Sequence, residues 1–202
     1  MKINFVYAFD YDRMLTLVLG ERFCDEQILE MRGYLHDVEE FWKKEQNSII
    51  NQIEKIAGMR FKGDADCYLV KDMFYTALSH PMTIKKEDDF DKSKAILIHE
   101  LIHVLFVQNK NKGEKMLRLL NEMFPGQDMV FRAHFPLLLV ERKVIESIYG
   151  DKFMKKVLEM DRHSDELDYV WKEANKVYKS FNSDVLSFLG KCYGQKNIGL
   201  LQ

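Results

Sequence analysis

The spacing of hydrophobic residues predicts a few short strands, all before residue 85, among many helices. Runs that are rich in aromatic and β-branched residues and that partly alternate apolar with polar positions are typical of strands. These runs are residues 3–9, 64–72 and 74–84. Pro81 lies in the last run and has no backbone N–H to donate, so we expect that strand at the edge of a sheet.

Apolar residues at helical spacing predict helices over most of the remaining chain. The predicted helices are 13–20, 25–57, one that ends at about Gln108, 114–124, 128–149, 151–160, 164–181 and 183–193. We expect the helix 25–57 to break near Gly33. Asp91 or Ser93 is expected to cap the helix that ends at Gln108. Residues 109–113 (NKNKG) are expected to form a turn.

A small sheet early in the chain with helices around it predicts an α+β fold. The chain has 202 residues, which is enough for one large domain, and it shows no internal repeat, low-complexity tract or linker. We therefore predict a single domain over residues 1–202 that is mostly helical and has a small N-terminal mixed sheet.

Composition excludes several classes of partner. The formal net charge of −2 gives no indication of nucleic acid or an anionic membrane surface as a partner. No apolar run approaches the ~20 residues of a transmembrane helix, and the N-terminus lacks the apolar core of a signal peptide. Cys24, Cys67 and Cys192 lie far apart, which indicates free thiols in a reducing compartment. We predict a cytoplasmic protein without nucleic-acid or membrane partners, and its oligomeric state is left open.

The most informative segment is residues 95–107, AILIHELIHVLFV, an apolar helix that carries His99, Glu100 and His103. Imidazoles and carboxylates are costly to bury without partners, so their presence in this helix needs a physical reason. Two histidines four positions apart share one helix face and can bind one metal ion. Glu100 lies about 100° further round the helix, where it can accept a proton from a water molecule on that ion. This is the H-E-x-x-H pattern of zinc hydrolases, and Zn²⁺ is the predicted cofactor.

The segment HELIH resembles the zincin superfamily of metallopeptidases, in which an edge strand precedes the H-E-x-x-H helix and a later helix gives the third ligand. The segments ALSHPMTI, ILIHELIHVLF and HFPLLLVERKVIE also resemble a group of poorly characterised prokaryotic metallopeptidases. Together these motifs cover about residues 74–148. The resemblance implies a zincin-like fold and a metallopeptidase of the gluzincin kind that acts on peptides or proteins.

Zinc in a catalytic site takes three protein ligands, so a third ligand must join His99 and His103. Glu141 is the first candidate, because its helical neighbours Leu137, Leu138, Val144, Ile145 and Ile148 are all apolar. A metal ion would explain a carboxylate on a buried stripe, although a salt bridge at the edge of the core would also explain it. Glu122 is a weaker candidate: its spacing from His103 resembles the aminopeptidase-type gluzincin pattern, but it lies in the last turn of a helix.

His134 ranks close behind Glu141, because it precedes Pro136 at the start of a predicted helix and shares a face with Glu141. The resembling group has a histidine in such an H-x-P context, often with a second histidine four positions later, where this chain has Leu138. His134 is thus predicted either as the third ligand or as a hydrogen-bond donor to the substrate.

The predicted reaction is the hydrolysis of a peptide bond with Glu100 as general base. A donor that holds the developing oxyanion is expected among His134, His163, Tyr149 and Tyr193. The edge strand at 76–84 is expected to hold an extended peptide by strand addition, and His80 within it is expected to be a plain surface residue. The main alternative is a catalytically inactive zincin fold that serves as a binding or regulatory module. A structural zinc site is disfavoured because such sites are usually rich in cysteine.

Overall fold

A computed structural model describes residues 1–161, 165–180 and 185–192. The elements in chain order are β1 (Ile3–Tyr7), α1 (Phe9–Val18), α2 (Asp25–Ala57), β2 (Ala65–Val70), β3 (Ala77–Ser79), β4 (Met82–Lys85), α3 (Phe90–Gln108), α4 (Lys110–Met123), α5 (Met129–Asp161), α6 (Asp165–Ser180) and α7 (Val185–Cys192). Most of the chain is helical and one small mixed sheet lies near its N-terminus, which confirms the predicted α+β class. Among the helices of these described residues, none is long and apolar enough to cross a membrane.

The chain groups into two compact units. The first comprises Met1–Ser48 and Gly63–Leu101, and the second comprises Ile49–Lys62 and Ile102–Gln202. Two helices, α2 and α3, run without interruption from one unit into the other. The prediction of a single domain over residues 1–202 is not tested by this grouping and stays a prediction.

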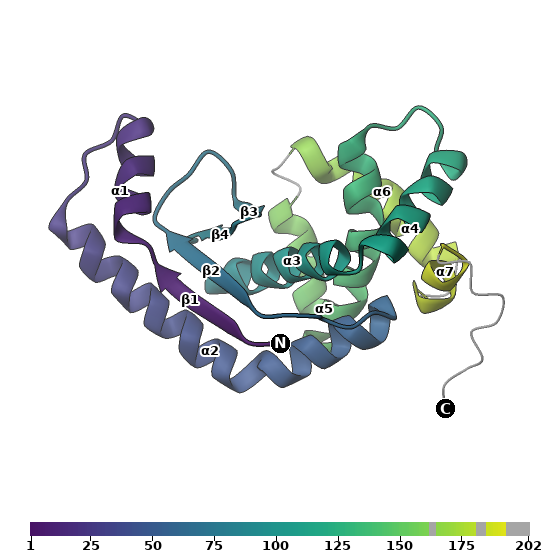
Figure 1. Ribbon diagram of the computed structural model, residues 1–202, viewed down its shortest axis with the longest axis horizontal. Helices are drawn as coiled ribbons and strands as arrows, with labels where there is room; N and C mark the ends of the chain where they lie inside the picture. The colour runs from purple at the N-terminus through teal and green to yellow at the C-terminus, as the bar shows by residue number, and fades with distance from the viewer. Residues whose placement is uncertain (162–164, 181–184, 193–202) are drawn as a thin grey trace. The chain divides into compact units, whose positions relative to one another are not determined.

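The first unit contains the sheet, with strand order β1-β2-β4-β3 (Figure 1). β1 and β2 are parallel, as are β2 and β4, whereas β3 and β4 are antiparallel, so the sheet is mixed. The register pairs Phe5 with Cys67 and Leu69 with Ile84, which places these four buried side chains on one face. Helices pack against this face and complete the core.

The predicted single strand at 74–84 is wrong, because the structure has two strands there. β3 and β4 form a hairpin, with a turn at His80 and Pro81 between them. The edge strand of the sheet is β3, and Pro81 lies outside both strands. Pro81 thus lies in the turn between two strands. There, as in an edge strand, no backbone N–H is needed for strand pairing.

Helices α2 and α3 cover the buried face of the sheet. Trp42 of α2 contacts Phe5 edge-on with 6.0 Å between ring centroids, and Phe41 contacts Phe90 of α3 at 5.8 Å. The predicted break of α2 near Gly33 is wrong, because α2 continues through this residue. A glycine costs a helix only ~1 kcal/mol, and the burial of neighbouring apolar side chains such as Met31 offsets it.

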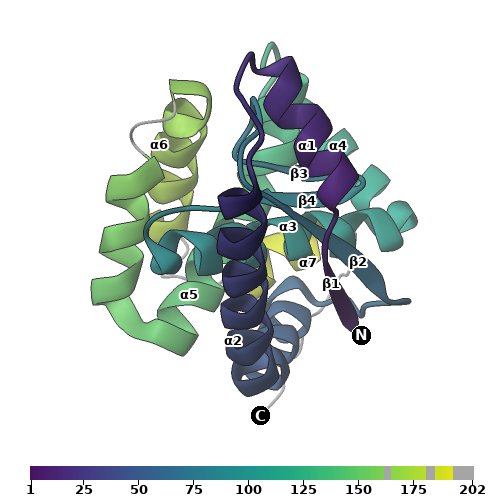
Figure 2. The same cartoon turned by 90° about the vertical axis from the view of Figure 1, so that its left-hand side faces the viewer.

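Helix α1 is unusual because it buries polar residues and exposes apolar ones. Asp12 is fully buried, and its carboxylate accepts hydrogen bonds from the Tyr7 hydroxyl (3.0 Å), the Gln27 amide (2.9 Å) and the Lys71 backbone N–H (2.7 Å). These bonds tie α1, which directly follows β1 (Figure 2), to the start of α2 and to the residue after β2. Burial and the Asp12 carboxylate both raise the pKa of Tyr7, which keeps the phenol protonated.

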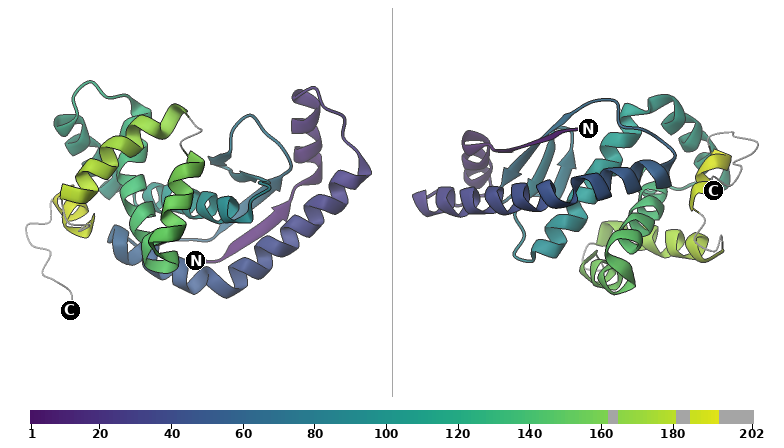
Figure 3. Two further views of the ribbon diagram at one scale, coloured as in Figure 1. Left: turned by 180° about the vertical axis from the view of Figure 1, so that it is seen from behind. Right: turned by 90° about the horizontal axis from the view of Figure 1, so that it is seen from below.

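The second unit is helical, and α5 and α6 pack against each other in it (Figure 3). Gly150 has φ 80° and ψ 173°, so it separates two helical segments within α5, as the predicted helices 128–149 and 151–160 require. The predicted turn at 109–113 is wrong, because α4 begins at Lys110. Lys110, Asn111 and Lys112 lie in the first turn of α4, where polar residues can be solvated as they are in a turn, and the buried Asn109 is the N-cap residue.

Gly33 and Gly150 make a matched pair for a stability test, because a Cβ added to either one meets no atom within 4 Å. Gly33→Ala should stabilise the protein by ~1 kcal/mol, since alanine has the higher helix propensity. Gly150→Ala should destabilise it by about 1–3 kcal/mol, since its backbone region is essentially restricted to glycine. Urea unfolding followed by circular dichroism measures both changes. Equal effects of the two substitutions would contradict the helical conformation of Gly33 or the positive φ of Gly150.

Candidate metal centre

Helix α3 carries the H-E-x-x-H motif as an apolar helix whose side chains are largely buried. Leu97, Ile98, Leu101, Ile102, Val104 and Leu105 are each at most 5% exposed. His99 and His103 are half-buried, and Glu100 is 5% exposed. The motif therefore lies in an apolar environment, as the sequence predicted, and its two imidazoles lie one helical turn apart on one face.

The start of α3 is fixed by a cap other than the predicted ones. The Asp89 carboxylate accepts a hydrogen bond of 2.9 Å from the backbone N–H of Asp91, which is the geometry of an N-cap. The predicted caps Asp91 and Ser93 are wrong, because both lie inside the helix. The Ser93 hydroxyl instead accepts a hydrogen bond of 2.9 Å from the buried Tyr34 hydroxyl of α2.

His134 lies near the start of α5 and is held there by buried aromatic neighbours. Phe131 and Phe135 flank it along the helix, are fully buried, and stack with 5.2 Å between their ring centroids. Phe124 packs against both of these rings at 5.1 and 4.9 Å. This packing fixes the first turns of α5, and with them the direction in which the half-buried His134 points.

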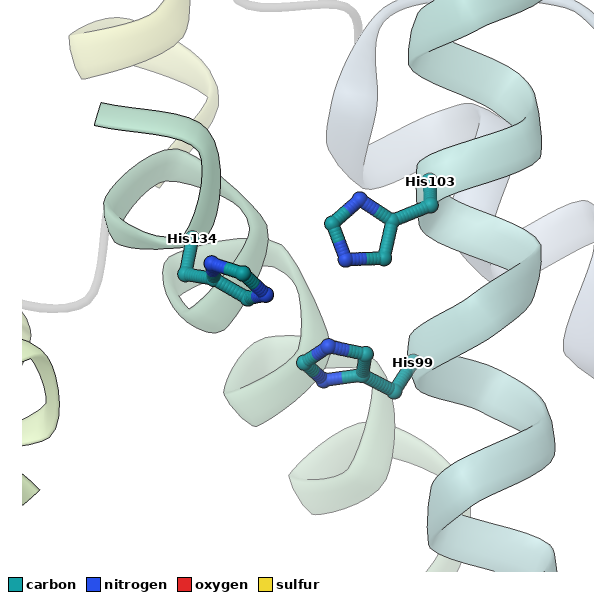
Figure 4. Close-up of side chains that lie close together, drawn as sticks. All are labelled: His99, His103 and His134. Carbon is teal, nitrogen blue, oxygen red and sulfur yellow. The ribbon is translucent and has the colours of Figure 1, made fainter. Parts of the chain in front are cut away.

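The His134 and His103 rings contact each other within the second unit, edge to face, with 5.0 Å between their centroids. His99 precedes His103 by one turn of the same continuous helix, so the geometry of α3 fixes its separation from His103. One ligand atom from each histidine lies within 4.8 Å of the other two. Figure 4 shows the three rings around a common space, two from α3 and one from α5.

The tautomer of His134 follows from its hydrogen bond to the main chain. Its Nδ1 lies 2.9 Å from the Val130 carbonyl oxygen. Because a carbonyl oxygen can only accept, Nδ1 must carry a proton, so in the neutral ring the lone pair lies on Nε2. A backbone partner of this kind on the second ring nitrogen is the usual way in which proteins orient a metal-binding histidine.

Glu100 is oriented by a residue that the sequence analysis missed. The Ser79 hydroxyl of the edge strand β3 donates a hydrogen bond of 2.7 Å to Glu100 Oε2, and both residues belong to the first unit. The sequence offered only a general indication, since Ser79 lies in the predicted edge strand next to His80. His80 itself is exposed, as expected for a surface histidine.

The other candidate ligands lie outside the histidine group. Glu141 is 2% exposed among fully buried residues such as Val144 and Ile145, so its predicted burial is confirmed, but it is not a member of the group. Glu122 is exposed in the last turn of α4 and is not a member either. The ligand roles of both remain untested. His163 and Tyr193, which were considered as oxyanion donors, lie outside the described residues.

The donor set of this group fits a zinc ion with one open position better than it fits a closed structural zinc site. Three imidazoles and no thiolate leave a fourth position open, which is typical of catalytic zinc sites. Cys67 is not a member of the histidine group, and burial and the charge of Glu100 raise the pKa of its thiol. Ligand nitrogens around tetrahedral zinc lie ~3.3 Å apart, so small rotations of these half-buried rings suffice to accommodate the ion.

The geometry leads us to expect that His134 contributes more to zinc affinity than Glu141 does. His134→Ala should weaken zinc binding by at least ~100-fold, since a lost ligand costs more than a lost outer partner. Glu141→Gln, which keeps the volume of the buried side chain, should weaken it by less than ~10-fold. Competition titration with a chromogenic chelator measures both affinities, and circular dichroism checks that each variant is folded. The reverse order would restore Glu141 as the third ligand, as the sequence first suggested.

Comparison with protein-family models, with curated proteins and with solved structures finds no match to this chain.

Proposed function

We propose that the protein is a zinc-dependent metallopeptidase with His99, His103 and His134 as zinc ligands and Glu100 as the general base. The observation that carries the proposal is the convergence of three imidazoles from two helices, with ligand atoms within 4.8 Å of one another. Glu100 on the same helix as two of them adds the carboxylate that hydrolysis needs. The resemblance of HELIH to the zincin pattern points to the same chemistry.

Each residue has a distinct role in this proposal. Zinc, when bound, lowers the pKa of water and polarises the carbonyl of the scissile bond. The histidines hold the ion, and the Val130 carbonyl keeps His134 in the tautomer whose Nε2 lone pair can bind it. Glu100 accepts the proton of the attacking water and passes it to the leaving nitrogen. Ser79 holds Glu100 in position through its hydrogen bond.

An extended peptide is the substrate that suits this arrangement. β3 is an edge strand, so one side of its backbone is open for pairing with another strand. Ser79 at the end of β3 contacts Glu100, so a peptide paired with β3 would pass close to the general base. Free cysteines at Cys24, Cys67 and Cys192 are compatible with an enzyme of the cytoplasm, as proposed from the sequence.

The proposal is tested with Glu100→Gln and a quenched-fluorescent casein substrate. The zinc-loaded wild-type protein should hydrolyse the casein, and the variant should lose about 10²–10⁴-fold in rate, since this is the usual contribution of a general base. Zinc content, measured by inductively coupled plasma mass spectrometry, should be equal in both. Hydrolysis that survives the substitution would contradict the mechanism. Tight zinc binding without any hydrolysis by the wild type would favour the inactive binding module.

Ser79 is expected to act as a positioning residue for Glu100. Ser79→Ala removes the hydrogen bond and should lower kcat by ~5–10-fold, the equivalent of about 1–1.4 kcal/mol, with little change in KM or zinc affinity. Ser79→Thr retains the hydroxyl and should restore most of the rate. A loss of zinc from Ser79→Ala, or a failure of threonine to restore the rate, would assign Ser79 a different role.

A further inference from the structure

The second edge of the sheet, formed by β1, is open and lies beside an apolar hollow. β1 ends the strand order opposite to β3 and pairs only with β2 among the described strands. Its sequence, INFVY, contains none of the charged or proline residues that usually protect an exposed edge. An edge of this kind is a template for pairing with a further strand.

The register of β1 shows which backbone groups are available. The Lys2 carbonyl accepts the hydrogen bond of the Ala65 N–H on β2, so the carbonyl points towards that strand. Because direction alternates along a strand, Asn4 and Val6 also bond to β2. The N–H and C=O groups of Ile3, Phe5 and Tyr7 therefore point to the outer edge, where a further strand would lie.

The hollow beside this edge has a volume of about 580 Å³. Phe5, Val6 and Tyr7 of β1 line one side, with Phe9 of α1 close by. Ile28, Arg32 and Leu35 line the other side and follow one another along one stripe of α2. Figures 1 and 3 show β1 running alongside α2. A strand added to β1 would extend the sheet over this stripe and bury Ile28 and Leu35, which are now half-buried.

Arg32 indicates the charge of a segment that would bind in this hollow. It is the one charged residue that lines the hollow, and within the described part of the chain its guanidinium makes no ion pair or hydrogen bond. Lys71, Lys85, Lys86 and Lys92 of the same unit all form ion pairs. The positive charge of Arg32 acts to lower the pKa of the Tyr7 phenol, but burial and Asp12 outweigh it and the phenol stays neutral. An exposed arginine at the side of an apolar groove is free to turn towards a bound segment and can bind a carboxylate there, often through two parallel hydrogen bonds.

We propose that the outer edge of β1 and the adjoining hollow bind an extended, acidic segment of another protein as a fifth strand of the sheet. Backbone hydrogen bonds to β1 supply the pairing, apolar side chains fill the hollow between β1 and α2, and a carboxylate pairs with Arg32. A second copy of this chain is a poorer occupant. Its own β1 brings Lys2 and no acidic residue, so self-pairing would place like charges together.

An array of six-residue peptides tests the charge preference. The peptides alternate Val, Ile, Leu or Phe with Thr and carry Glu, Gln or Lys at one apolar position. Glu peptides should bind the full-length protein about two- to fivefold more tightly than Gln peptides, since an exposed ion pair contributes up to ~1 kcal/mol. Lys peptides should bind most weakly. Arg32→Gln should remove this order and Arg32→Glu should reverse it, whereas Arg118→Gln, at an exposed arginine of α4, should leave it unchanged.

The pairing geometry is tested on the peptide that binds best. N-methylation of alternate amides should abolish binding in one register and spare it in the other, because only one edge of the added strand faces β1. Glu100→Gln should leave this binding unchanged, which separates it from the proposed peptidase site. The proposal is overturned if no peptide binds, or if the charge order is absent in the wild type. It is also overturned if sedimentation shows a dimer in which β1 is protected from hydrogen exchange.

Discussion

The cost of burying polar side chains is the constraint on which this structure depends most. Helix α3 is apolar on nearly every side, yet it carries two imidazoles and a carboxylate. Such groups are tolerated only where each finds a partner. Glu100 accepts a hydrogen bond from the Ser79 hydroxyl. The Val130 carbonyl accepts one from His134 Nδ1, which leaves the lone pair of the neutral His134 ring on Nε2. The imidazoles of His99, His103 and His134 converge, with one ligand atom of each within 4.8 Å of the others, which is the arrangement on which the proposed zinc site rests.

Much of the fold was predictable because hydrophobic period and chain length determine the type of an element. Errors arose where a local signal competed with packing. Gly33 does not break α2, since buried neighbours outweigh its low propensity. The polar residues from Lys110 onward continue as a helix, because a solvated helix face and a turn favour the same residue types. Pro81 was placed within a strand, whereas it lies in the turn between β3 and β4. By contrast, Gly150 separates two helical segments, as its place between two predicted helices required, and it does so with a positive φ.

The candidate site was predictable in part, for a physical reason. The spacing of His99, Glu100 and His103 is local, so helix geometry alone places them together. The third ligand depends on which turn of α5 lies opposite α3, and no sequence pattern specifies that alignment. Glu141 was ranked above His134 because its burial was easier to infer, and its burial is confirmed. Burial is a weaker guide than convergence, however, because His134 meets the histidines of α3 while only half-buried.

Both edges of the sheet are open to strand addition, but a strand added at one edge would lie in different surroundings from a strand added at the other. Ser79 ties β3 to Glu100, so a strand added there lies near the proposed reaction. β1 is separated from β3 by β2 and β4, which at the usual strand spacing places the two edges ~14 Å apart. Segments bound at the two edges would therefore not collide. Both would nevertheless pair with the same hydrogen-bonded sheet. Within it, β2 pairs with β4, and Lys71 directly after β2 bonds to Asp12. Binding at β1 would thus extend the sheet at the edge opposite to Ser79, without occupying the position of a substrate.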